Sequence, residues 1–414
     1  MIEWSEQQRQ IRQMFRKFVE AEIAPKREEL EFGDTPPYDV LRKMMTTFGI
    51  GEMQKGEFRA DIQKQKAAAE KGSDEPPQKK EGKPNPMKGE AMAMRMLPII
   101  ELSRYSPGLI TAMGVSLGLT AGAIRRRGTI AQQERWVPDL LTMKTIGAWA
   151  ITEPGSGSDA FGAMKATAKR DGDGGYILNG SKTFITNGPF ADVIVFICKL
   201  DEGNPPAERK IVTFVLDGDT PGLTRSKPLR KMGLHASPTG ELFLEDVKVG
   251  LDRLLGETED QPSRSSAKQT FTAERTGVAA MALGIVKRCL ELSVDYAKNR
   301  VQFGKSIGEF QLIQLKLAKM KVAHSNIQNL VFRQIEMAAQ GKSMDLAEAS
   351  ACKLYSAQAA MDVALEAVQL FGGNGYMAEY QVEQLARDAK VLQIYGGTDE
   401  IQISQIARDL LARA

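Results

Sequence analysis

The sequence is poor in the residues that most often build metal sites, disulfides and hydrolytic relays. Its 414 residues include three cysteines and only two histidines, His235 and His324. With only two histidines, a histidine-ligated metal site or a Ser-His-Asp relay is not expected. Cys198, Cys289 and Cys352 lie far apart without CxxC spacing, which argues against a disulfide framework, a zinc site and a thioredoxin-like pair. We therefore expect buried cysteines in a reducing compartment, no metal, and acid–base chemistry that rests mainly on carboxylates.

The chain also lacks a strong charge of one sign. Its 55 Lys and Arg residues oppose 52 Asp and Glu residues, for a formal charge of +3, and "AIRRRG" (123–128) is the only compact basic run. This balance does not indicate a nucleic-acid partner. The first residues lack the regions of a signal peptide, and no apolar run is expected to reach membrane-spanning length. We expect a cytoplasmic protein with no membrane partner.

Hydrophobic periodicity divides the chain into helical, β-rich and helical parts. Before about 145 and after about 265 the apolar residues recur at helical spacing, and a weak capping box, Ser5 with Gln8, begins the first helix. Between these parts, short β-rich runs separated by Gly, Pro, Asn and Asp predict antiparallel strands. The predicted fold class is α+β. Its domains are an N-terminal helical domain (1–145), a middle β domain (146–262) and a C-terminal helical bundle (263–414).

Residues 54–90 interrupt the first helical domain. Lys, Glu, Gln, Pro and Gly dominate "KGSDEPPQKKEGKPNPMKG", and mixed charge with prolines is typical of segments without a packed core. The sequence predicts either a flexible insertion between helices or a helix followed by a disordered loop.

The stretch "GAWAITEPGSGSDA" (147–160) contains G-x-G-x-x-A, which formally matches the dinucleotide-binding fingerprint. That motif needs a helix directly after the glycines and an acidic residue at the ribose-binding distance, and the sequence predicts neither here. A loop of this kind still exposes N–H groups and hydroxyls, including those of Thr152 and Ser158, at the end of a strand. It is either a simple turn or one wall of a site for a polar ligand.

Five motifs in a fixed order give the chain a family resemblance. They are "ITEPGSGSD" (151–159), "FITNG" (184–188), "RVQFGKSIGEFQ" (300–311), "QLFGGNGY" (369–376) and "YGGT" (395–398). In order and spacing they resemble the acyl-CoA dehydrogenase family, outside the 54–90 insertion. The resemblance implies an FAD enzyme with an N-terminal helical domain, a middle β domain and a C-terminal four-helix bundle, assembled as a homotetramer.

The resemblance also implies which residues bind FAD. Those expected near the flavin are Ile151, Thr152, Ser158, Phe184, Ile185 and Thr186; many members have tryptophan in place of Phe184. Those expected around the rest of the cofactor are Arg300, Phe303, Phe310, Gln311, Gln369, Leu370, Gly372, Gly373, Thr398 and Glu400. Arg300 is expected to bind the diphosphate of a neighbouring subunit, since a guanidinium matches phosphate oxygens in a fork. The residues alone leave two alternatives open. Arg300 could be an exposed arginine at the end of a helix, and Gly372 and Gly373 could be a helix C-cap.

One residue that the chemistry needs is absent from its usual place. Flavin-dependent α,β-oxidation of a thioester requires a carboxylate that removes the α-proton, with a pKa raised by burial. The most frequent family motif supplies it as the glutamate of Y-E-G-T, where this chain has Gly396. In members that resemble isovaleryl-CoA and long-chain acyl-CoA dehydrogenases, the base lies near the start of the first bundle helix, and "TFTAERTG" places Glu274 there. An acid in a helix's first turn is also favoured by the helix dipole, which would lower its pKa.

We therefore predict Glu274 as the base and a backbone N–H at Gly396 as a donor to the thioester carbonyl. The residues expected on the substrate side are Ser158, Thr272, Arg275, Tyr395 and Gly397. Space left by Gly396 suggests a long or branched acyl chain. The expected reaction yields trans-2-enoyl-CoA and passes electrons to an electron-transfer flavoprotein. The alternatives are a flavin oxidase or monooxygenase of the same fold, and a non-catalytic flavoprotein relative with a DNA-associated or silent-subunit role.

Overall fold

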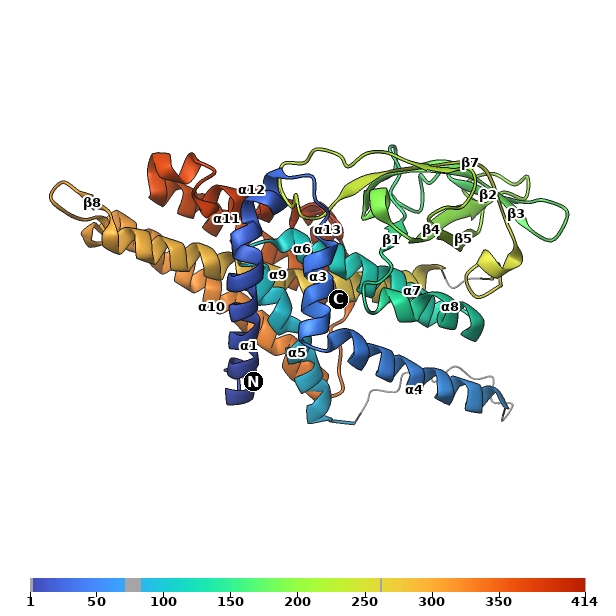
Figure 1. The fold of residues 1–414 in the computed structure, drawn as a ribbon, viewed down its shortest axis with the longest axis horizontal. Coiled ribbons are helices and arrows are strands. Elements are labelled where there is room, and N and C mark those ends of the chain that lie inside the picture. The colour runs from blue at the N-terminus through green and yellow to red at the C-terminus, as the bar shows by residue number, and fades with distance from the viewer. Residues whose placement is uncertain (1–2, 71–82, 261–262, 414) are drawn as a thin grey trace.

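The computed structural model describes residues 3–70, 83–260 and 263–413. Helices fill the chain before the sheet (Figure 1). They are α1 (Glu6–Phe18), η1 (Val19–Ile23), η2 (Ala24–Lys26), α2 (Arg27–Phe32), α3 (Tyr38–Thr47), α4 (Ile50–Glu70), α5 (Pro86–Leu102), α6 (Pro107–Gly114), η3 (Val115–Thr120), α7 (Ala121–Arg127) and α8 (Ile130–Leu140). The predicted capping box at the start of α1 is present, with Gln8 N donating to Ser5 Oγ and Ser5 N to Gln8 Oε1.

Part of the predicted insertion is a docked helix. Residues 54–70 belong to α4, whose Phe58 and Ile62 are buried in one hydrophobic cluster with Trp136 of α8. Phe58 and Ile62 are four residues apart and so share one face of the helix, which gives it an apolar contact despite its charged surroundings. Residues 86–90 begin α5, and residues 71–82 lie outside the described residues.

The expectation that no apolar run reaches membrane-spanning length is wrong for one stretch. Among the described residues, Pro107–Arg127 is long and apolar enough by length and composition, with a mean hydropathy of 1.5, because α6, η3 and α7 join end to end. In the structure 61% of this stretch is buried inside the protein. Such burial is typical of a core helix.

Seven strands form one sheet between Gly147 and Val249. They are β1 (Gly147–Ala150), β2 (Thr167–Arg170), β3 (Tyr176–Thr186), β4 (Val193–Leu200), β5 (Ile211–Asp217), β6 (Leu223–Arg225) and β7 (Thr239–Val249), with the short helices η4 (Gly188–Phe190) and η5 (Leu251–Arg253). Their order is β1-β4-β2-β3-β7-β6, and β5 pairs with β4. Most pairs are antiparallel as predicted, but β1 and β2 both run parallel to β4. Parallel neighbours need a long connection, and here the chain passes through β3 and η4 before it reaches β4.

The central strand β4 is buried along its whole length because both faces of the sheet are covered. Ile194, Phe196 and Cys198 lie in the cluster inside the β domain. Val193 and Val195, on the alternate face, join the cluster formed with α4 and α8. This explains why the strand reads as a continuous apolar run.

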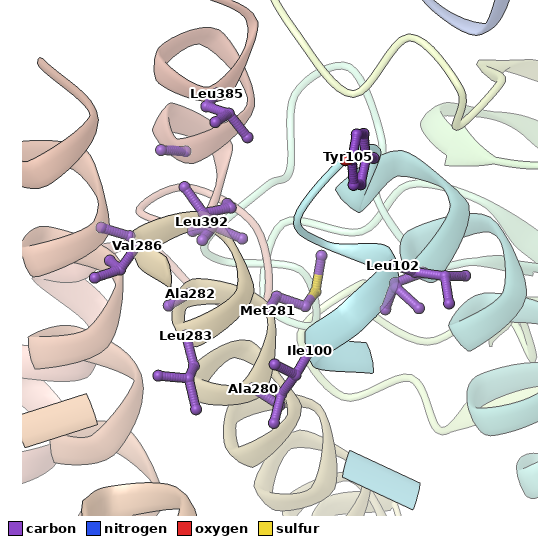
Figure 2. Packing of buried hydrophobic residues seen from close by; sticks show 14 of the residues in the cluster. Ile100, Leu102, Tyr105, Ala280, Met281, Ala282, Leu283, Val286, Leu385 and Leu392 are labelled. Atoms are coloured by element: carbon purple, nitrogen blue, oxygen red, sulfur yellow. The ribbon is translucent and has the colours of Figure 1, made fainter. Parts of the chain in front are cut away.

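The remaining chain is helical apart from one hairpin (Figure 1). Its elements are α9 (Ser263–Asn299), β8 (Val301–Gln302), β9 (Lys305–Ser306), η6 (Ile307–Glu309), α10 (Gln311–Ala339), α11 (Leu346–Phe371), η7 (Gly372–Tyr376), α12 (Gln381–Val391) and α13 (Asp399–Arg413). In Figure 2, Ile100 of α5 lies beside Ala280 of α9, and Leu102 of α5 and Leu385 of α12 belong to the same hydrophobic cluster. The N-terminal and C-terminal helices therefore share one hydrophobic core, which holds the ends of the chain together. All three cysteines are buried and unpaired, as predicted.

Candidate active site

Glu274 and Gly396, the two departures from the usual motif, lie side by side. A Cβ built on Gly396 would lie 3.4 Å from Cδ and 3.5 Å from Oε1 of Glu274. Burial raises the pKa of Glu274 to about 7, against the opposing charges of Arg275 and Lys353. Glu274 is the twelfth residue of α9 and not in its first turn, so the helix-dipole argument does not apply to it. The site thus has a carboxyl group with a pKa near neutrality where a side chain at 396 would point.

The turn at 396–397 needs glycine and leaves two donors open. Gly396 and Gly397 have φ of 61° and 90°, in the region that disfavours side chains. Gln402 Nε2 donates to both carbonyls, at 3.1 and 2.7 Å, and Lys353 Nζ donates to the Gly397 carbonyl at 2.9 Å. Among the described residues, the N–H groups of these glycines donate to no acceptor. Because the carbonyls are fixed by side chains, the N–H groups have a fixed direction and are available to a ligand.

The residues predicted on the substrate side have different surroundings. Tyr395 donates its hydroxyl to Met281 Sδ at 3.3 Å, and burial raises its pKa. Thr272 is partly buried, one turn before Arg275 on α9. Arg275 is only 5% exposed and donates to Ser350 Oγ at 2.9 Å, so its guanidinium is turned into the bundle. Tyr395 and Arg275 therefore pack against the protein, and their predicted contact with substrate stays a prediction.

The residues predicted near the flavin come together at one end of the sheet. Thr183 N donates to Thr152 O at 2.9 Å, which joins the loop after β1 to β3. A β-bulge between Lys182 and Ile185 turns Phe184 outward at φ 56°, 69% exposed, while Ile185 is buried. Ser158, farther along the loop, is exposed. The bulge thus presents an aromatic ring beside a loop with polar groups.

A buried ion pair, which the sequence reading missed, holds this loop in place. Lys182 is fully buried and lies 2.8 Å from Glu153 Oε1, and its Nζ also donates to Ile151 O at 3.0 Å. The Glu153 carboxylate also accepts from the backbone N–H groups of Lys165 and Ala166, at 2.6 and 3.0 Å. Lys182 is in phase with the buried positions of β3. Because a buried lysine is rarely left unpaired, its place in the sequence could have signalled an acidic partner.

Helix α6 connects this end of the sheet to the turn at 396. Thr111 of α6 hydrogen-bonds Tyr395, and the next residue, Ala112, accepts from Asn187 Nδ2 at 2.9 Å. Asn187 has φ of 64° and follows Thr186 at the end of β3. The Glu274 region and the residues predicted near the flavin therefore belong to one continuous part of one chain.

The residues predicted around the rest of the cofactor form a separate group. Arg300 N donates to Tyr296 O at 2.8 Å, and Tyr296 OH lies 3.3 Å from the carbonyl at the end of α11. Arg300, Gln369, Gly372 and Gly373 are exposed beside this tyrosine, whereas Leu370 is buried. The ring of Phe303, at the hairpin tip and 94% exposed, contacts that of Phe310 edge to face, next to Gln311. In Figure 1 this hairpin and the sheet lie at opposite ends of the molecule.

Thr398 and Glu400 begin the last helix. Ile401 N donates to Thr398 Oγ1 at 3.4 Å, so Thr398 caps α13. Glu400 is exposed, and its pKa is lowered by hydrogen bonds from its own backbone N–H and from Thr398. Their predicted contact with FAD stays a prediction.

Comparison with protein-family models decides the family. Residues 264–411 match the C-terminal domain of acyl-CoA dehydrogenase, residues 148–247 the middle domain and residues 52–144 the N-terminal domain. The chain belongs to the acyl-CoA dehydrogenase family. The N-terminal match runs through much of the region that the sequence reading set apart as an insertion.

Curated relatives are similar over most of the chain. A short-chain-specific acyl-CoA dehydrogenase of Megasphaera elsdenii is 41% identical over 74% of this chain and 79% of its own length. An acyl-CoA dehydrogenase of Bacillus subtilis is 36% identical over 98% of each chain. A mitochondrial isovaleryl-CoA dehydrogenase of Pongo abelii is 33% identical over 98% of this chain and 88% of its own.

Solved structures of the family share the whole fold. Butyryl-CoA dehydrogenase from Megasphaera elsdenii superposes with a TM-score of 0.82 at 33% identity, covering 99% of this chain and 100% of that one. A chain from a study of the electron transferring flavoprotein of Acidaminococcus fermentans gives 0.80 at 31% identity, with 99% of each chain covered. Glutaryl-CoA dehydrogenase from Mycobacterium smegmatis, in complex with FADH2, gives 0.80 at 27% identity, covering 98% and 95%.

The residues present in this acyl-CoA dehydrogenase fit FAD, the family's cofactor. The exposed ring of Phe184 and the polar loop beside it offer a surface for a flat, hydrogen-bonding ring system. The guanidinium of Arg300 is exposed and has no acceptor among the described residues, as a diphosphate-binding cation requires. At Gly372 and Gly373 an added Cβ would meet open space, so a nucleotide can approach the backbone.

Other residues around the turn also escaped the sequence reading. Lys353, Asp399 and Gln402 lie behind Gly396 and Gly397, and Lys353 is fully buried. The only signal for Lys353 was a single lysine among the small residues of "SACKLYSAQAA". Its partners, Gly397 and Asp399, lie more than 40 residues away in the sequence. The periodicity of one helix cannot predict such contacts.

Proposed function

We propose that Glu274 is the base of an FAD-dependent α,β-dehydrogenation that converts an acyl-CoA thioester to trans-2-enoyl-CoA, the first step of β-oxidation. The observation that carries the proposal is the contact between the Glu274 carboxyl group and the position where most family members hold their glutamate side chain. A carboxylate at either position would reach the same space. The family membership supplies the reaction class.

The residues of the chain act on the thioester end of the substrate. Glu274 takes the α-proton, so that the C–H bond breaks and an O–H bond forms on its carboxylate. The open N–H groups of Gly396 and Gly397 donate to the thioester oxygen as negative charge develops there, and such a donor contributes about 3–4 kcal/mol to the transition state. Bound FAD supplies the acceptor for the hydride of the β-carbon. A pKa of about 7 gives Glu274 both a usable ionised fraction and basicity near neutral pH.

Anaerobic mixing with acyl-CoA tests the base assignment. Reduction of the flavin by substrate should bleach its visible absorbance in the wild-type protein. Glu274→Gln should retain FAD, but its flavin should be reduced at least about 10²-fold more slowly. Glu348→Gln is a matched control, since Glu348 is paired with Arg333 at the surface of the same bundle. Normal reduction of the Glu274 variant would refute the assignment.

The proposed substrate is a branched acyl-CoA. The sequence left long and branched chains open because Gly396 frees space, and the similarity to an isovaleryl-CoA dehydrogenase supports the branched alternative. Similarity to short-chain-specific enzymes makes butyryl-CoA the natural competitor. Reduction rates with isovaleryl-, 2-methylbutyryl-, butyryl- and octanoyl-CoA separate these possibilities. A clear preference for butyryl-CoA would contradict the proposal.

The proposed electron acceptor is an electron-transfer flavoprotein. The similarity over 99% of this chain to a solved structure from work on the electron transferring flavoprotein of Acidaminococcus fermentans supports this pairing. Turnover should require the acceptor protein and give little hydrogen peroxide in air. Rapid peroxide formation without it would instead indicate the oxidase alternative.

The proposed assembly is a homotetramer in the cytoplasm. Arg300 and the hairpin lie far from the flavin-facing loop of their own chain in Figure 1, which supports a cofactor site completed by a second copy. Buried, unpaired cysteines are consistent with a reducing compartment.

A further inference from the structure

A buried lysine lies directly behind the turn that faces Glu274. Lys353, the eighth residue of α11, donates its Nζ to the Gly397 carbonyl at 2.9 Å. The same Nζ lies 3.4 Å from Oδ1 of Asp399, the first residue of α13. Gly397 follows Gly396, where an added Cβ would meet Glu274. Lys353 therefore approaches the proposed base from the protein side of the turn.

The structure fixes the position of this lysine, and Asp399 opposes the lowering of its pKa that burial causes. Burial of an ammonium group is unfavourable unless partners compensate for lost water. Asp399 is the counter-ion, and it is fixed in turn by Gln358 and Gln393, each donating to its Oδ2 at 3.2 Å. A side chain that only filled space at position 353 would need no charge. It would also not need a counter-ion such as Asp399, which is itself held by two glutamines.

We propose that Lys353 is a positioning residue: it holds the 396–397 turn and supplies a positive charge that favours the ionised form of Glu274. The proposal rests on the proposed role of Glu274 as base. It extends that role to a residue on another helix that does not touch substrate.

The charged groups around Glu274 agree with this role. Arg275 on α9 and Lys353 on α11 are the two cations that oppose the effect of burial on its pKa. On the other elements, Asp399 of α13 pairs with Lys353, and Tyr395 carries a hydroxyl whose pKa is raised. Arg275 is held separately from Lys353, by a hydrogen bond from its guanidinium to Ser350 Oγ. Loss of the Lys353 charge should therefore raise the pKa of Glu274.

Proton exchange isolates the step that Lys353 affects. The thioester 3,3-dimethylbutyryl-CoA has α-protons but no β-hydrogen, so the enzyme can remove a proton and return a deuteron from D2O, but no hydride transfer follows. Exchange by the FAD-loaded enzyme is followed by proton NMR across pH 5.5–9. The variants are Lys353→Met and Lys353→Gln, which remove the charge, and Lys353→Arg, which keeps it. Lys316→Met, which breaks the ion pair of Lys316 with Glu366 elsewhere in the bundle, is the control.

Wild-type exchange should rise with pH through a midpoint near that of Glu274. In the Met and Gln variants the midpoint should move upward by about 0.5–1 pH unit. The Arg and Lys316 variants should keep the wild-type midpoint. Unchanged midpoints in both neutral variants, even with slower exchange, would overturn the proposal and leave Lys353 only a structural support.

Failure of the base assignment gives a different result. Wild-type protein would then show no exchange, or Glu274→Gln would exchange as fast as wild type. Lys353→Gln retains a hydrogen-bond donor for Gly397, so the charge can be tested even where Lys353→Met does not fold.

Discussion

The Glu274 carboxyl group lies where a Cβ on residue 396 would meet it, and this proximity accounts for both departures from the usual motif. With φ of 61° at 396, any side chain there would be strained, yet its Cβ would meet the Glu274 carboxyl only at ordinary contact distance. Glycine at 396 therefore allows the backbone conformation of the turn without strain, and Glu274 on α9 provides the carboxylate. Burial of the Glu274 carboxyl group in the folded protein raises its pKa.

This burial predicts a pH-dependent cost in stability. The folded-state pKa of Glu274, about 7, lies above the unfolded value, so between about pH 4.5 and 7 the folded protein binds more protons. Stability should fall as pH rises through this window. Glu274→Gln removes the group and should be more stable than wild type at pH 8.5, by on the order of 1–3 kcal/mol, and closer to wild type at pH 5. Denaturant unfolding of both proteins at the two pH values measures this, and a gap that does not change with pH would contradict it.

Individual elements show where sequence patterns succeeded. The α–β–α order, the capping box of α1 and the breaks between bundle helices are local features, set by residues close in sequence. The helical identity of 54–70 was obscured because only Phe58 and Ile62 carry its apolar face. The parallel pairs of β4 depend on partners distant in sequence, and strand patterns do not fix direction.

At the end of β3, the pair Glu153 and Lys182 should be a main support of the flavin-facing loop. Lys182→Met leaves the buried carboxylate without its cation and should destabilise the protein by about 3–5 kcal/mol and weaken FAD retention. Lys210→Met, at the exposed pair with Asp260, should change stability by less than about 1 kcal/mol. Denaturant unfolding and FAD release report the two effects.

The double variant Glu153→Gln/Lys182→Met sharpens this test. It removes both charges and should recover part of the stability lost in the single variant, since no unpaired charge stays buried. A Lys182 variant as stable as the Lys210 control would show that the pair contributes little.

At the scale of the whole molecule, the predicted cofactor residues fall into two groups that one chain keeps apart. The loop at 151–158 and the bulge at Phe184 lie at the sheet, and Arg300 lies at the base of the hairpin at the opposite end (Figure 1). Helix α6 joins the first group to Glu274, whereas Arg300 directly follows the C-terminal end of α9, the helix that carries Glu274 nearer its start. This separation is the basis of the proposal that a second copy completes the cofactor site.

Mixed oligomers test this arrangement. Glu274→Gln and Arg300→Ala should each abolish or strongly reduce flavin reduction when present in all subunits. If Arg300 serves the neighbouring site, oligomers reassembled from both variants contain some sites with intact Glu274 and intact Arg300, and activity should return to up to about half of the sites. If Arg300 serves its own chain, every site carries one lesion and no activity returns. Restored activity in the mixture, measured against each variant alone, decides between them.

The sequence by itself determined the order of elements, the family and the candidate base. These depend on local periodicity and on motifs whose spacing survives along the chain. Only the tertiary structure decided that Glu274 lies against the position of Gly396, that Lys353 and Gln402 bind the carbonyls of the turn, and that the predicted cofactor residues of one chain are divided. Contacts of this kind join residues far apart in sequence, and their geometry exists only once α9, α11 and α13 have packed together.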